Sequence, residues 1–569
     1  MATLGAAGRD QLDESLVDPC AAPSPAPYTR RISADGKVVA GVMEPAPTRS
    51  TAGNRQRLVL IAMTLANAMI LVDQTAVPLA LPDIMNTFGV GSDSVQWVIN
   101  ASLLALAGLL VLGGRLADLL GRRRIFLLGS ALFAGASAVA GLAPIFMVLL
   151  AARVVQGVGG ALMLPATVAI VSSAYSKETR GKALGTMGGT AAIAGALGPT
   201  IGGVLTSALS WRAVLLINLP LLALTLMFTL RAVPPDEPRR GHVHVDLSGA
   251  VLLCITLVGL VFGLAQTTVW EWSSPGVIGP VLISLVAATL FVLRERRAHN
   301  PLMSLKLLRA KRNYLGATLS QGLAGMAEMG LGLIFPLVLI LNMGMTPAMA
   351  GLALIPTTLP MVIMAPLAGR WYDRVGGRPP LVAGFLLLAL SGLLLAFGVG
   401  QNNYLALLPG LLVYGTGLAI VLSVNDPVSL DTLPESDEGQ ASGVSATAEQ
   451  GGGAIGIAVL YALFHTAYLT RLESEIEARG MPRLDAATGA AFKEGIQAAE
   501  QTGLQPGAFD PTLLQYLIPA ERASDFGYSV TFLAVTVLAL VGAAVTAFLV
   551  RKPAADSDDV ETASSDLPA

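Results

Sequence analysis

Residues 114–121 read Gly-Arg-Leu-Ala-Asp-Leu-Leu-Gly, and residues 369–376 read Gly-Arg-Trp-Tyr-Asp-Arg-Val-Gly. Both copies fit the pattern GRxxDxxG and lie 255 residues apart. Each copy begins at the end of an apolar stretch, 94–114 for the first and 347–369 for the second. Each stretch is the second of a set of six. A motif that recurs at the same place of two sets predicts two halves that are parallel repeats.

Fourteen apolar stretches are long enough to cross a membrane as helices. A helix that spans the hydrocarbon core needs about 20 mostly apolar residues, and transmembrane strands would alternate in polarity instead. We place the spans at 57–80, 94–114, 125–143, 145–173, 183–208, 212–230, 247–268, 276–293, 313–341, 347–369, 380–399, 404–425, 441–467 and 526–550. The predicted fold class is therefore an all-α integral membrane protein, with two six-helix bundles and two extra helices.

The composition excludes several classes of protein. Of the 569 residues, 53% are hydrophobic and 13% are charged, whereas soluble domains carry about 25% charged residues. So much apolar surface excludes a cytosolic enzyme, a nucleic-acid binder and a disordered chain, and a net charge of −2 creates no bulk field that would attract a polyanion. The two cysteines, Cys20 and Cys254, and the scattered histidines predict no metal site.

The distribution of basic residues predicts how the chain is oriented in the membrane. The loops and C-terminal tail on one side carry 22 Lys and Arg residues, whereas the short loops on the other side carry Arg212 alone. The positive-inside rule then places both termini in the cytoplasm.

We divide the chain into a disordered tail (1–56), an N-terminal bundle (57–231), a linker with two extra helices (232–312), a C-terminal bundle (313–550) and a second tail (551–569). An external loop at 470–525 is predicted to contain a helical hairpin, from 471–479, which ends at Gly480, and 485–499.

Further segments in the right spans carry a family resemblance. They are DQT at 73–75 with ALPDI at 80–84, RVVQG at 153–157 and GALGPTIGG at 195–203. Together with the loop 114–124, they resemble the signatures of the major facilitator superfamily. The resemblance covers the chain from Arg57 to Lys552, and fourteen spans resemble the branch of drug:proton antiporters that export multiple drugs.

The repeated motif predicts a cytoplasmic gate. Its residues are Gly114, Arg115, Asp118, Gly121 and Arg122, with Gly369, Arg370 and Asp373 in the second copy. A carboxylate at Asp118 can stabilise the positive end of a helix and pair with arginines. The resemblance implies that it bridges the halves and stabilises the outward-facing state. Alternatively, the motif only sets the topology.

The fifth span carries the antiporter motif of the resembled family, at Gly195, Gly198, Pro199, Gly202 and Gly203. Small residues four apart let helices approach closely in lipid, and a proline favours a kink. The resemblance implies contact with the other half and a link to antiport, while generic close packing is the simpler alternative.

Charges inside spans are costly, by about 2.5–3.5 kcal/mol each, and usually functional. Asp73 and Arg153 lie at similar depths, roughly 13 and 12 Å from the outer face at 1.5 Å per residue, and Gln156 follows one turn after Arg153. We therefore expect Asp73 and Arg153 to face each other and Asp73 to accept a proton. A permanent ion pair that only joins two helices is the alternative.

Glu328 is an acidic residue at mid-depth in the ninth span, with Gln321 on the same face. We expect Glu328 to face a central cavity and to bind cationic substrates or carry a second proton, unless it makes a purely structural hydrogen bond. Met326 and Met329 begin a methionine-rich region that suits varied ligands, although methionine also fills gaps in a core.

These features predict a secondary exporter in the plasma membrane, not an enzyme, that exchanges protons for amphipathic, cationic drugs. We expect no cofactor, because the sequence has no P-loop and a proton gradient supplies the energy. The expected partners are lipids, protons and small amphipathic substrates, with no nucleic acid, and the chain is expected to be a monomer. A dedicated exporter of one metabolite, lipid or siderophore is the first alternative, and a non-transporting sensor or scaffold is the second.

Overall fold

The computed structural model describes residues 30–32, 38–40, 49–236, 246–268, 270, 272–298, 308, 311–430, 438–482 and 514–551. The chain forms two compact units, Met1–Asn54 and Arg55–Ala569.

The first unit contains a short hairpin. Strand β1 (Arg30–Ile32) pairs antiparallel with β2 (Val38–Ala40), with Arg31 opposite Val39. We expected residues 1–56 to be a disordered tail. The structure instead has two strands in this segment, and the first helix already begins at Arg49.

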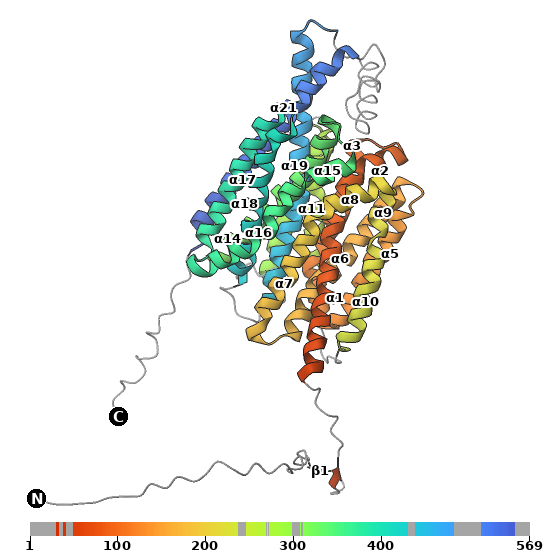
Figure 1. Cartoon of the computed structure of the whole chain (residues 1–569), viewed down its shortest axis with the longest axis vertical. Helices are drawn as coiled ribbons and strands as arrows, with labels where there is room; N and C mark the ends of the chain where they lie inside the picture. Colours follow the sequence, from red (N-terminus) through yellow and green to blue (C-terminus); the bar gives the residue numbers. More distant parts are fainter. Residues whose placement is uncertain are drawn as a thin grey trace, which may run out of the picture. The chain divides into compact units, whose positions relative to one another are not determined.

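Fourteen helices of the described chain are long and apolar enough to cross a membrane, which confirms the predicted fold class. Their long axes run side by side (Figure 1). The N-terminal half consists of α1 (Arg49–Ala76) with η1 (Val77–Ala80) and α2 (Leu81–Phe88), α4 (Trp97–Leu120), α5 (Arg122–Gly141), α6 (Phe146–Ala174), α7 (Lys177–Ala196) with α8 (Gly198–Ala208), and α9 (Trp211–Leu216) with α10 (Asn218–Ala232). A one-turn helix, α3 (Ser92–Val95), precedes α4.

The C-terminal half repeats this arrangement. It consists of α14 (Arg312–Leu337) with the π-helical turn η3 (Val338–Asn342), α15 (Pro347–Ala353) with α16 (Ile355–Val375), α17 (Arg378–Val399), α18 (Tyr404–Leu430), α19 (Glu438–Ala478) and α21 (Leu517–Leu549). Between the halves in sequence lie α11 (Leu247–Ala265), η2 (Gln266–Thr268) and α12 (Pro275–Arg297).

Prolines divide several spans into two helices. The fifth span breaks at Leu197, two residues before Pro199, and the tenth breaks at Leu354, two residues before Pro356. A proline lacks the backbone N–H of a helix interior but is tolerated in the first turn. Because Pro199 has no N–H to donate, the Gly195 carbonyl is left to accept from Thr75 Oγ1 of α1 at 2.7 Å.

The halves pack closely where α8 meets α15. A side chain at Gly203 would lie 2.3 Å from the Pro347 carbonyl oxygen, so only glycine permits this approach. Thr200 Oγ1 donates to the Gly351 carbonyl at 3.0 Å, and Ser207 Oγ accepts from the Ala348 amide at 3.2 Å. These contacts join the antiporter motif to the second half.

The C-terminal end of α19 and the N-terminal end of α21 extend beyond the other helices as a pair (Figure 1). Leu472 and Ile476 of α19 pack against the first turns of α21 at Leu517 and Ala520. Gly480, just after α19, has a φ of 63°, which favours glycine. The predicted first arm, 471–479 with its end at Gly480, matches α19, whereas the predicted second arm, 485–499, lies outside the described residues.

The extra pair α11 and α12 packs as a hairpin, with the Ser284 hydroxyl donating to the Thr256 carbonyl at 2.7 Å. Asp246 caps α11 by accepting from the Gly249 amide at 2.9 Å, and Arg294 of α12 lies 3.4 Å from the same carboxylate. Burial raises the pKa of Asp246, but the hydrogen bonds from Gly249 and Ser248 and the charge of Arg294 outweigh it, so this pKa lies below its usual value.

Replacing Asp246 by Ala should therefore destabilise the purified protein by about 1 kcal/mol, as is usual for loss of a helix cap. A lowered carboxyl pKa adds stability above the unfolded-state pKa of about 4, and this stability is lost as pH falls through the native value. Thermal melting at pH 7 should separate Asp246→Ala from wild type, and the difference should shrink at acidic pH. Asp246→Asn, which can still cap, should lie between them; a wild-type melting curve for Asp246→Ala at pH 7 would contradict the assignment.

Candidate functional site

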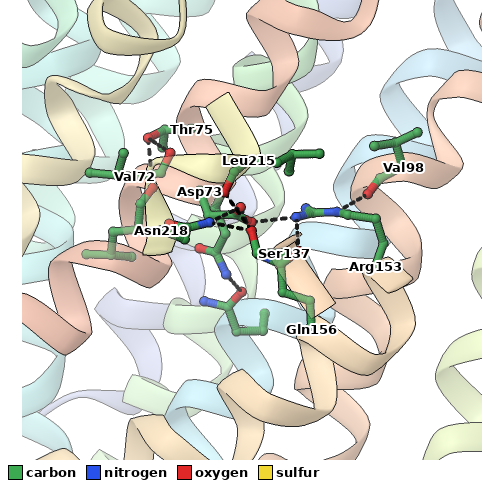
Figure 2. Close-up of polar contacts among 12 residues, drawn as sticks. Val72, Asp73, Thr75, Val98, Ser137, Arg153, Gln156, Leu215 and Asn218 are labelled. Carbon is green, nitrogen blue, oxygen red and sulfur yellow. Dashed lines mark hydrogen bonds and ion pairs between the residues drawn. The ribbon is translucent and has the colours of Figure 1, made fainter. Parts of the chain in front are cut away.

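A buried ion pair lies at the centre of the N-terminal half. Arg153 of α6 donates from one terminal nitrogen to Asp73 Oδ2 of α1 at 2.6 Å. The side chains of Asp73 and Arg153 are only 2% and 1% exposed. Arg153 Nε donates to the Val98 carbonyl at 2.7 Å, which holds the guanidinium between α1 and α4 (Figure 2).

Three neutral side chains complete the network around Asp73. Asp73 Oδ1 accepts from Gln156 Nε2 at 2.9 Å and from Asn218 Nδ2 at 3.0 Å. Asn218 also donates to Ser137 Oγ at 2.9 Å, and Ser137 donates to the Leu215 carbonyl at 2.8 Å. Figure 2 shows these groups converging on the carboxylate from α5, α6 and α10. The hydrogen bonds offset part of the cost of removing both charges from water.

The structure brings the predicted residues Asp73, Arg153 and Gln156 into direct contact, whereas Asn218 and Ser137 were not predicted. Both have a signal in the sequence. Asn218 is an amide within the sixth apolar span, and Ser137 is a hydroxyl in the third. The sequence does not show which side chains these two residues contact, because the contacts depend on how each helix is rotated about its axis.

The antiporter motif packs directly beside this network. Thr75, two residues after Asp73, donates to the Gly195 carbonyl at 2.7 Å. A side chain at Gly198 would overlap Thr75 Oγ1, and one at Gly202 would lie 2.4 Å from the Ala76 carbonyl oxygen. The junction of α7 and α8 therefore touches α1 on one side and, through Gly203, the second half on the other.

A second polar cluster lies between α14 and α19 in the C-terminal half. Gln321 donates to the carboxylate of Glu449. Glu328 interacts electrostatically with Glu449, and Glu449 with Asp426 of α18. Glu328 Oε2 is buried with no hydrogen-bond partner among the described residues. Gly325 makes this proximity possible, because its backbone packs against that of Glu449.

Glu449 is a site residue that we did not predict. It lies inside the predicted span 441–467, next to Gln450, so an intramembrane carboxylate was visible in the sequence. Its pairing with Gln321 was not, because the two residues are 128 positions apart. Of the two methionines in the predicted cavity, Met326 is half-buried, and Met329 is buried in a hydrophobic cluster with residues of both halves.

The two copies of the GRxxDxxG motif share one backbone feature. Gly121 and Gly376 end α4 and α16 with φ angles of 111° and 82°. Asp236, after α10, accepts from the Arg123 and Arg124 amides at 3.1 and 2.9 Å, so it caps α5. Arg122 donates to the Ala169 carbonyl at 3.0 Å.

The other predicted gate residues are placed as follows. Gly114 and Arg115 lie in α4, and Asp118 lies in its last turn. Gly369 is half-buried in α16, where Arg370 and Asp373 are exposed. The bridging role of the motif stays a prediction.

Replacing Gly121 by Ala should lower stability by about 1–3 kcal/mol, since the residue would be strained at positive φ and its side chain would meet the Asp236 carboxylate. Gly135→Ala is the matched control in the adjacent helix, because no atom lies within 4 Å of an added side chain there. Thermal melting of the purified proteins checks this. Equal melting temperatures for the two variants would refute the close approach of Asp236.

The fold and the buried ion network define a multi-pass membrane transporter. Residues 63–457 match the model of the Major Facilitator Superfamily, so the chain belongs to that superfamily.

Relatives and solved structures agree with this assignment. The chain is 35% identical over 428 residues to the multidrug resistance protein Stp of Mycobacterium tuberculosis, covering 75% of this chain and 79% of Stp. It is 32% identical over 497 residues to the tetracenomycin C resistance and export protein of Streptomyces glaucescens, covering 86% and 90%. A bacterial homologue of the human lysosomal transporter Spinster, in an inward-facing and unoccupied conformation, has a similar fold: the TM-score is 0.58 at 16% identity, over 88% of this chain and 99% of that one.

Proposed function

We propose that this protein exports amphipathic, cationic drugs or toxic compounds across the plasma membrane in exchange for protons, by alternating access and with both termini in the cytoplasm. The observation that carries the proposal is the buried ion pair of Asp73 and Arg153. A permanent structural link at this depth would be costly, and ionisable groups inside membrane helices usually belong to ion pathways.

Protonation of Asp73 supplies the switch. The neutral carboxyl no longer balances Arg153, whose remaining contacts are the neutral oxygens of Gln156 and Val98. An unbalanced buried charge is unfavourable by several kcal/mol, so the helices around it shift to a different packing. The shift passes through Thr75 to the junction of α7 and α8, which touches the second half at α15.

The carboxylates of Glu328 and Glu449 favour a cationic substrate. Both are half-buried, and Glu328 Oε2 is buried without a donor among the described residues, so a cation bound beside it would pair with an unsatisfied oxygen. The names of relatives such as Stp and the multidrug efflux pump LfrA of Mycolicibacterium smegmatis support drug export. A dedicated exporter of one metabolite is the second candidate, favoured by relatives named for a single antibiotic, such as tetracenomycin C.

Replacing Asp73 by Asn should abolish the response of export to a pH gradient. We expect gradient-driven transport in proteoliposomes to fall by more than about tenfold, because removing one partner of a buried ion pair costs about 3–5 kcal/mol. The control is Asp83→Asn, which removes a carboxylate from the same span without touching the network. Full gradient-driven export by a well-folded Asp73→Asn protein would rule out the switch.

Replacing Glu328 by Gln should separate substrates by charge. Export of organic cations should fall about tenfold, as expected for losing a charge-assisted contact of roughly 1.5 kcal/mol, while export of neutral compounds persists. Glu473→Gln, at an exposed site on the outer part of α19, is the matched control. An equal loss for cations and neutral compounds would assign Glu328 a structural role.

A further inference from the structure

One hydrogen bond joins the two halves close to both polar clusters. Gln74 Nε2 of α1 donates to Gln450 Oε1 of α19 at 3.0 Å, between residues 376 positions apart. Gln74 and Gln450 are 7% and 4% exposed. Each glutamine neighbours an ionisable residue, Asp73 in the first half and Glu449 in the second.

We propose that the Gln74–Gln450 hydrogen bond couples the proton site at Asp73 to the cation site at Glu328 and Glu449, so that each ligand disfavours the other. This inference rests on the proposed function and adds two positioning residues to it. Neither glutamine touches the proton, and both act through the neighbouring carboxylate.

The geometry on the α19 side makes Gln450 sensitive to the cation site. The backbones of α14 and α19 are in contact at Gly325 with Glu449 and at Gly322 with Gly452. Within a rigid helix, Gln450 moves whenever α19 shifts at Glu449. A cation that draws Glu328 and Glu449 together therefore fixes α19 in the position where Gln450 meets Gln74.

The geometry on the α1 side makes Gln74 sensitive to the proton. Among the described contacts of Asp73, Arg153 carries the only charge, and Gln156 and Asn218 are neutral. The hydrogen bond of Gln74 therefore belongs to the arrangement in which Asp73 is ionised and paired. A proton on Asp73 releases Arg153, α1 shifts, and the contact with Gln450 is lost.

The energy of this bond is of the right size for coupling. A buried amide that loses its partner costs about 1–3 kcal/mol, and allosteric coupling of about 5- to 150-fold corresponds to the same range. Coupling is reciprocal, so a bound cation disfavours a proton on Asp73 by the factor with which the proton weakens the cation. Mutual exclusion of this kind is what an exchanger requires.

The contribution of the two glutamines can be measured by comparing the effect of Asp73→Asn on cation affinity in the wild-type protein and in a double glutamine variant. Full-length protein in lipid nanodiscs is titrated with ethidium and with tetraphenylphosphonium, and Asp73→Asn serves as a fixed mimic of the protonated state. In the wild-type background we expect Asp73→Asn to weaken cation binding at least about fivefold. In the Gln74→Met/Gln450→Met background, where neither amide is left unpaired, Asp73→Asn should change the affinity less than about twofold.

A matched control tests whether any contact between the halves has this effect. Ser207→Ala removes the bond from the Ala348 amide to Ser207, which also joins the halves, and the effect of Asp73→Asn should persist there. A second measurement avoids Asp73→Asn. Cation binding to wild type in weak buffer should release protons, and the double glutamine variant should release fewer of them.

The outcomes distinguish this inference from the proposed function. An unchanged effect of Asp73→Asn in the double glutamine background, or its loss in the Ser207→Ala background, would overturn the coupling role while leaving Asp73 as the proton site. No saturable binding of either cation to wild type would overturn the cation site and this inference with it. Full gradient-driven export by Asp73→Asn would instead overturn the proposed function itself.

Discussion

The arrangement of the N-terminal half depends on removing one pair of opposite charges from water. Asp73 and Arg153 face each other at 2.6 Å with almost no exposure. Such a pair is tolerated inside a membrane protein only if the remaining donors and acceptors are satisfied. This requirement explains why Gln156 of α6, Asn218 of α10 and the Val98 carbonyl of α4 converge on the pair.

Close backbone contacts link the helix that carries Asp73 to the opposite half of the molecule. Glycines at 198 and 202 let α8 lie against α1 immediately after Asp73, and Gly203 lets the same helix lie against α15. The break before Pro199 separates α7 from α8 at this point. One short helix therefore contacts both α1, directly after Asp73, and the opposite half, an arrangement that a continuous helix with larger side chains would not permit.

Much of the fold was predictable, because lipid leaves few alternatives. A chain in hydrocarbon must satisfy its backbone hydrogen bonds internally, so each long apolar stretch forms a helix. The fourteen predicted spans correspond to the fourteen apolar helices of the described chain. The ends of the helices were less predictable. Helix α19 continues to Ala478, beyond the predicted end at 467, because its last turns pack on α21.

The sequence alone determined the number of spans, the duplicated halves and the presence of Asp73 and Arg153 inside spans, because polar residues stand out in apolar runs of helical length. Only the tertiary structure decided which side chains meet. Asn218 joins Asp73, Gln321 joins Glu449, and Gln74 joins Gln450 across positions far apart in the chain. These pairings depend on the rotation of each helix about its axis and on backbone contacts at glycines, which are set by packing between helices and not by any local pattern of residues.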